Sequence, residues 1–351
     1  MSQVNLLSPP SLIPPPTALA LAQKAPLVLT SSPISSLPWP LSLLFSRESP
    51  ESWTIHENLL LATLRTGDDA SARKILDRLA TRFGADNERI ITLRGIYEEA
   101  LATNNAELES VFNGYEKILR EDPTNFGIRK RRVAVLKSMG RHADAISALT
   151  VLLENSPTDI EAWAELSELY AGQGLWSQAV FCLEEVLLVL PNAWSVSLPL
   201  NPPCALPSHY ALERRNANAN NPQAHAQLAT LHYLTTPTTL NTLTLSLRYF
   251  CRSIELNDTY LRGFYGLKLV TQKLIPLLSD STSLKRNNSD EDEAGPPPKL
   301  EAVKKLEELA TSKLAEIVRQ HGSGKKEWQG LDEAEVAAAR ELLDRDGKVE
   351  R

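Results

Sequence analysis

The sequence is poor in cysteine and contains no apolar run long enough to cross a membrane. Only Cys182, Cys204 and Cys251 occur among 351 residues, and their odd number and wide spacing argue against a disulfide framework or a cysteine-ligated metal site. A reducing compartment is therefore expected. No stretch of about 18 apolar residues is present, and no basic segment precedes an apolar core as in a secretory signal. We expect a soluble chain that reaches a membrane only through a partner.

Motifs for catalysis or cofactor binding are also missing. The sequence has no glycine-rich phosphate-binding loop and no G-x-S-x-G nucleophile motif. His225 and His232 would lie on one face of a helix, but no third ligand accompanies them, so a metal site is not predicted. These absences predict a chain that is not an enzyme and that has no cofactor, metal or catalytic residues.

Prolines recur at a regular interval in the middle of the chain. Pro123, Pro157 and Pro191 are equally spaced, in the segments EDPTN, NSPTD and VLPNA. Their spacing equals the tetratricopeptide period of about 34 residues. Apolar residues at i, i+3 and i+4 precede each proline, as in amphipathic helices, and proline ends the second helix of each pair because it cannot continue a helix. The predicted fold class is an all-α tetratricopeptide-repeat α-solenoid with disordered or irregular N-terminal and linker segments.

The unit at residues 160–193 fits the repeat pattern well. The matching positions are Trp163, Leu166, Ser167 (in the glycine position), Tyr170, Ala179, Leu183 and Pro191. We expect the large residues Trp163 and Tyr170 of the first helix to fill the space beside the small Ala179 of the second. The whole set is predicted to pack the repeats together rather than to contact a ligand.

Composition divides the chain into four segments. Residues 1–50 hold ten of the 23 prolines and are predicted to be irregular, apart from a short helix over 17–29 that Pro26 ends or kinks. The solenoid is predicted over 51–275. Residues 276–299 are polar and charged and are predicted to form a disordered linker. Residues 300–351 are predicted to form C-terminal helices, over 300–321 and 331–346.

Residues 196–223 interrupt the solenoid. The next position equivalent to Pro191 is Asp258, which falls one position short of two full periods, but the prolines at 199, 202, 203 and 207 exclude a first helix. The segment corresponds to 84 nucleotides, in frame, and its ends are compatible with splice-site codons. A retained intron, a surface loop and a functional binding loop all stay open. Trp194 and Leu228 are expected to pack in the same solenoid core.

The densest positive charge is RKRR, formed by Arg129, Lys130, Arg131 and Arg132. In one interpretation these residues belong to a solvated helix face. In another they line the inner face of the solenoid and bind an acidic partner segment. Nucleic-acid binding is disfavoured because the net charge is −6 and no aromatic residues are interleaved. The four residues are the candidate partner-binding site.

Longer stretches of this region resemble one known family. The segments ILREDPTN, RKRR, EAWAELSELY and AVFCLEEV, followed later by LRYFCRSIELND and LRGFYGL, resemble subunit 2 of the ER membrane protein complex. The resemblance covers about 53–269, with a weaker similarity over 300–321. The proline-rich N-terminus and the acidic linker resemble those of fungal members.

The resemblance implies a non-catalytic scaffold, peripheral on the cytoplasmic face of the endoplasmic reticulum membrane. Such a subunit binds cytosolic parts of the other subunits, notably the soluble part of subunit 5. The complex inserts tail-anchored and multipass membrane proteins. The alternative is a free tetratricopeptide co-chaperone or adaptor that grips acidic peptide tails at Arg129–Arg132.

Overall fold

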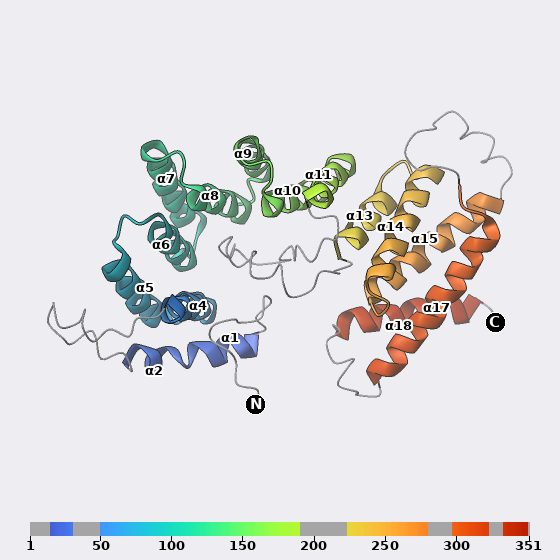
Figure 1. The fold of residues 1–351 in the computed structure, drawn as a ribbon, viewed down its shortest axis with the longest axis horizontal. Coiled ribbons are helices and arrows are strands. Elements are labelled where there is room, and N and C mark those ends of the chain that lie inside the picture. Colours follow the sequence, from blue (N-terminus) through green and yellow to red (C-terminus); the bar gives the residue numbers. More distant parts are fainter. Residues whose placement is uncertain (1–14, 31–49, 190–222, 280–296, 323–332, 350–351) are drawn as a thin grey trace. The chain divides into compact units, whose positions relative to one another are not determined.

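The computed structural model describes residues 15–30, 50–189, 223–279, 297–322 and 333–349 (Figure 1). Within these ranges every regular element is an α-helix, and short turns join most consecutive helices. The predicted all-α class is therefore confirmed. Contacts group the chain into two compact units, which divide between Ala148 and Leu149 within helix α9. Each unit is described by itself.

The first unit is built from consecutive helices that pack through buried apolar side chains. Buried leucines and isoleucines of α4, α5 and α6, such as Leu60, Ile75 and Leu93, form one cluster, because each helix is apolar along one stripe. The helices are α1 (Pro15–Ala22), α2 (Ala25–Thr30), α4 (Pro50–Thr66), α5 (Asp69–Phe83), α6 (Glu88–Leu101), α7 (Asn105–Glu121), α8 (Phe126–Ser138) and the first half of α9 (His142–Asn155).

The second unit continues with helix pairs and ends in two long helices. Leu247, Leu267 and Val270 of α14 and α15 form a core that Val303 and Ala310 of α17 complete. The C-terminal helices thus pack onto the preceding pairs. The helices are α10 (Ile160–Gly172), α11 (Trp176–Val189), α13 (Gln223–Leu234), α14 (Leu240–Leu256), α15 (Leu261–Ser279), α17 (Leu300–Gly322) and α18 (Glu333–Val349).

The repeat period is reproduced in the local geometry of the turns. Asn125 caps α8 by accepting a hydrogen bond from the Ile128 amide at 3.0 Å, and Asp159 caps α10 by accepting one from the Glu161 amide at 3.1 Å. Such caps satisfy amides that lack a partner at a helix start. Gly140 and Gly174 have φ angles of 74° and 75°, which glycine adopts without steric cost. The same turn chemistry therefore begins the pairs α8–α9 and α10–α11 and ends the first helix of each.

Two predicted boundaries differ from the structure, both at prolines. The break in the N-terminal helix falls at Gln23 and Lys24, before Pro26, which is the second residue of α2. Proline is tolerated there because first-turn amides have no partner within the helix. The predicted linker begins at 276, but α15 includes Pro276 and continues to Ser279. Leu278 is buried at this end, and its packing extends the helix past the proline.

The interruption at 196–223 lies largely outside the described residues, as do Pro191, Trp194 and most of the linker. Gln223, the last residue assigned to the interruption, is the first residue of α13. Leu228 of α13 is fully buried against Ala179 and Leu183 of α11. The two helices that flank the interruption therefore share one core.

Candidate protein-binding surfaces

The four basic residues of α8 do not lie on a common surface. Arg131 is only 1% exposed, whereas Arg129, Lys130 and Arg132 are half-buried. Arg131 occupies the apolar stripe of α8, at i+3 from Ile128 and i−4 from Val135, and both of these residues are buried. In the sequence, its place in this apolar stripe is what distinguishes Arg131 from Arg129, Lys130 and Arg132.

Arg131 belongs to a buried polar triad that joins α6, α7 and α8. The Arg131 Nε donates to Glu99 Oε1 at 2.9 Å, its Nη2 also pairs with Glu99 Oε2, and the Tyr115 hydroxyl donates to Glu99 Oε1 at 2.6 Å. Burial, together with the charge of Glu99, raises the pKa of Tyr115 well above its usual range. A Cβ at Gly95 would lie 2.4 Å from the Tyr115 hydroxyl, so the close approach requires glycine. Arg131 is thus a structural residue, and its assignment to partner binding is wrong.

The other three basic residues are partly accessible to solvent, and two of them already interact with side chains of this chain. Arg132 pairs with Glu116 at 3.1 Å between Nη1 and Oε1, and the Lys130 ammonium lies 5.7 Å from the centroid of the Phe126 ring. Exposed ion pairs of this kind are worth about 1 kcal/mol or less, so a partner carboxylate can exchange with them. Arg129, Lys130 and Arg132 therefore remain a proposed contact surface.

Most of the predicted repeat-packing residues lie inside or at the ends of helix pairs. Leu166, Ala179 and Leu183 are buried. The hydroxyl of Ser167, which stands in the glycine position, donates to the buried Ala179 carbonyl at 2.8 Å and so joins α10 to α11. Pro123 and Pro157 are exposed in the turns before α8 and α10.

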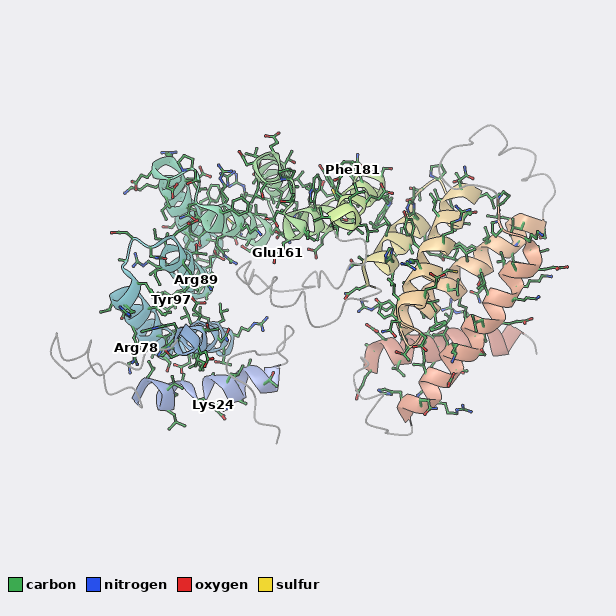
Figure 2. All side chains as sticks on the ribbon, in the orientation of Figure 1. Lys24, Arg78, Arg89, Tyr97, Glu161 and Phe181 are labelled. Carbon is green, nitrogen blue, oxygen red and sulfur yellow. The ribbon has the colours of Figure 1, made fainter. Side chains whose placement is uncertain are left out.

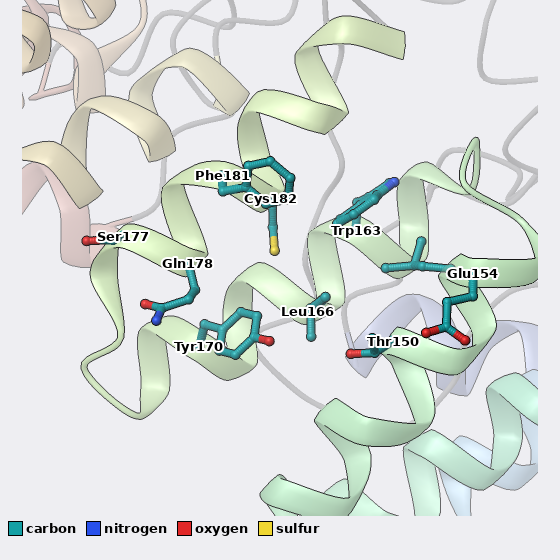
Figure 3. Close-up of a pocket in the computed structure, with 10 residues that line it drawn as sticks. Thr150, Glu154, Trp163, Leu166, Tyr170, Ser177, Gln178, Phe181 and Cys182 are labelled. Carbon is teal, nitrogen blue, oxygen red and sulfur yellow. The ribbon is translucent and has the colours of Figure 1, made fainter. Parts of the chain in front are cut away.

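Trp163 and Tyr170 are both half-buried. Tyr170 packs against the cluster that contains Ala179 and Leu183, whereas Trp163 does not belong to that cluster. The Trp163 indole donates to the Pro157 carbonyl at 2.8 Å, which directs the ring toward the turn instead of into the core. A pocket of about 560 Å³ is left between the end of α9, α10 and α11 (Figure 3). Its walls are mainly apolar, and its polar lining residues are Thr150, Glu154, Ser177 and Gln178. Both rings line this pocket, and their role in packing the repeats stays a prediction.

The aromatic wall of this pocket is fixed in place. The Phe181 ring meets the Trp163 ring edge to face, with centroids 5.9 Å apart and an interplanar angle of 80°, which is a favoured aromatic geometry. Cys182 is buried behind Phe181, and burial, with a contribution from the charge of Glu185, raises the pKa of its thiol to about 12. The thiol is therefore not a nucleophile near neutral pH.

The described residues contain no arrangement of three His, Cys, Asp or Glu side chains that could hold a metal ion. His225 and His232 instead flank Tyr249, with ring centroids 6.3 and 5.5 Å from the tyrosine ring. Burial lowers the pKa of His232 to about 4. Among the described helices, none combines the length and the apolarity that a bilayer crossing requires.

Comparison with known proteins identifies the family. The family model described as "EMC2 TPR-like repeat domain" matches residues 66–200. The chain is 29% identical over 265 residues to "TPR repeat protein oca3" of Schizosaccharomyces pombe, covering 75% of this chain and 82% of that protein. It is 30% identical over 243 residues to "ER membrane protein complex subunit 2" of Xenopus tropicalis, covering 69% and 70%, and 23% identical over 232 residues to the Saccharomyces cerevisiae protein of the same name, covering 62% and 68%. The predicted tetratricopeptide-type repeats are confirmed, and the chain belongs to the ER membrane protein complex subunit 2 family.

Proposed function

We propose that this chain is a non-catalytic scaffold subunit that holds cytosolic parts of other subunits of the ER membrane protein complex. Through that role it supports the insertion of tail-anchored and multipass membrane proteins. Membership of the subunit 2 family carries the proposal. Stacked helix pairs add support, because such pairs offer extended binding surfaces.

We place the chain on the cytoplasmic face of the endoplasmic reticulum, held there by protein partners. Cys182 and Cys251 are free thiols, which suits a reducing compartment. Subunit 5 is the proposed main partner, and the surface of Arg129, Lys130 and Arg132 is a proposed contact for acidic segments. The alternative of a free co-chaperone that grips acidic tails has less support, because Arg131 lies in the buried triad.

Depletion of the chain tests the proposal. We expect the levels of the other subunits to fall and the insertion of a tail-anchored reporter to drop, since unassembled subunits lose their scaffold. Re-expression of the chain should restore both. Alkaline extraction of membranes should release the chain into the supernatant. Normal reporter insertion and unchanged subunit levels in depleted cells would overturn the proposal.

A further inference from the structure

We propose that the pocket between α9, α10 and α11 binds a positively charged amphipathic helix of a partner protein. The partner would insert a bulky apolar side chain into the pocket, against the Trp163 and Phe181 rings, and place lysine or arginine beside Glu154 and Glu185. This inference rests on the proposed scaffold function in taking the occupant to be a segment of another protein. It differs from the interaction expected from RKRR, because the charge of the partner has the opposite sign.

The first step is the exposure of apolar side chains at the pocket. Phe181 is 53% exposed although it lines the pocket, and Leu188, two turns further along the same face of α11, is 73% exposed. Isolated exposed apolar residues are ordinary, but a cluster beside a concave apolar site marks an interaction surface. An apolar side chain placed there would complete the burial of both aromatic rings.

The second step is the charge of the helices that form the pocket. Residues 149–189 contain seven Asp and Glu residues and no Lys, Arg or His. Glu154 lines the pocket, and Glu185, one turn after Phe181, lies close enough to Cys182 to act on its thiol. Figure 2 shows Phe181 and Glu161 at opposite edges of the α10–α11 pair, so negative charge also extends beyond the pocket. The segment that forms the pocket therefore carries negative charge only.

The third step combines both features into one kind of partner. An apolar peptide without charge would leave Glu154 and Glu185 without a counter-ion, and an acidic tail would be repelled. Lysine and arginine place an apolar stem on an apolar wall and a cation at its rim. Helices α9 and α11 flank α10 (Figure 3), and a groove between helices accepts the apolar face of an amphipathic helix. A basic amphipathic helix therefore matches both the apolar walls and the negatively charged rim of the pocket.

Binding of designed peptides to the purified full chain tests the inference. The probe is a fluorescein-labelled helical peptide of about four turns, with leucine and tryptophan along one face and lysine on both flanks. The matched peptide has glutamate at every lysine position. In fluorescence anisotropy we expect the lysine peptide to bind about tenfold tighter or more, with an affinity that falls as salt rises. Equal affinities for the two peptides would overturn the inference.

Matched variants locate the binding site. The double substitution Glu154→Lys and Glu185→Lys should weaken the lysine peptide by about tenfold or more and strengthen the glutamate peptide, whereas Glu121→Lys, an exposed change on α7, should alter neither. Phe181→Ser should weaken both peptides, whereas Phe83→Ser, at a residue 45% exposed in the first unit, should not. Circular dichroism checks that each variant keeps its helices.

Two other results would refute the proposed occupant. If Glu154→Lys with Glu185→Lys binds the lysine peptide like the unchanged chain, the pocket is not its site. If the chain alone self-associates in sedimentation equilibrium, and Phe181→Ser abolishes this, the occupant is a second copy. Both assays use the isolated chain, so they are independent of the reporter insertion that tests the scaffold function.

Discussion

Arg131 and Arg132 are adjacent in the sequence but have different physical roles. Arg131 is buried against Glu99 and Tyr115, whereas Arg132 pairs with Glu116 and both of these side chains are about 30% exposed. A buried charge that loses its partner keeps the full cost of desolvation, but an exposed one is compensated by water. The two residues therefore offer a matched comparison on a single helix.

Replacing Arg131 by methionine should destabilise the chain by about 3–5 kcal/mol, because Glu99 would stay buried without its cation. Arg132→Met should cost less than about 1 kcal/mol. Urea unfolding of the full chain, followed by circular dichroism, measures both. Similar losses from the two substitutions would contradict the assignment of Arg131 to the triad.

His232 should make the second unit sensitive to mild acid. Its pKa is lowered from 6.5 to about 4 by burial, so between these values the unfolded chain binds a proton that the folded chain excludes. The free energy of unfolding is thus highest above about pH 6.5 and decreases as the pH falls. At pH 5 it should be about 2 kcal/mol lower than at pH 7. The variant His232→Phe keeps an aromatic ring against Tyr249. Its free energy of unfolding should decrease by about 2 kcal/mol less than that of the unchanged chain between pH 7 and pH 5. An identical pH dependence of unfolding in both proteins would refute this.

At the scale of helices and turns, the turns recur with the repeat period of the sequence more regularly than the contacts between helix faces do. The caps at Asn125 and Asp159 and the glycines at 140 and 174 each recur after one repeat period. The contacts between helices do not recur in this way. In the first unit α6 and α7 approach closely at Gly95 and Tyr115, and in the second unit α14 and α15 approach closely at Phe250 and Gly266.

Two glycines of the first unit should respond to alanine with opposite signs. Gly95→Ala would force a Cβ into the Tyr115 ring, which the Glu99 hydrogen bond holds in place, and should destabilise by about 1–3 kcal/mol. Gly114→Ala lies on the exposed side of α7 with no atom near the new Cβ, and should stabilise by about 0.5–1 kcal/mol. Melting temperatures measure both, and a shift of the same sign in both variants would contradict the packing described for Gly95.

Periodicity in the sequence predicted the helices and their turns because both depend on residues close together in the chain. It also predicted that Leu166, Ala179 and Leu183 would be apolar packing positions. The Arg131–Glu99 pair joins residues a full helix pair apart, and the pocket depends on how the Trp163 ring is held by Pro157. Such contacts arise only when helices meet, so the repeat pattern could not reveal them.

For the molecule as a whole, the interruption at 196–223 is where the predicted repeat pattern of the sequence breaks. Helix α13 begins at Gln223, and Leu228 packs directly on α11. The helices on either side of this point therefore share a core that includes Ala179, Leu183 and Leu228.

If the segment is a retained intron, mature transcripts should contain a form shorter by 84 nucleotides. A chain without residues 196–223 should then unfold at the same temperature as the longer one. Reads across the locus and a melting curve of the shortened chain measure these two outcomes. Uniform coverage of codons 196–223 in mature message would eliminate the intron interpretation.

The scaffold role is tested most directly by affinity purification of the tagged chain from detergent-solubilised membranes, with quantitative mass spectrometry of what is recovered. We predict near-equal amounts of the membrane-embedded subunits of the ER membrane protein complex, subunit 5 among them. Recovery of the tagged chain with soluble chaperones alone, and without any membrane subunit, would contradict it.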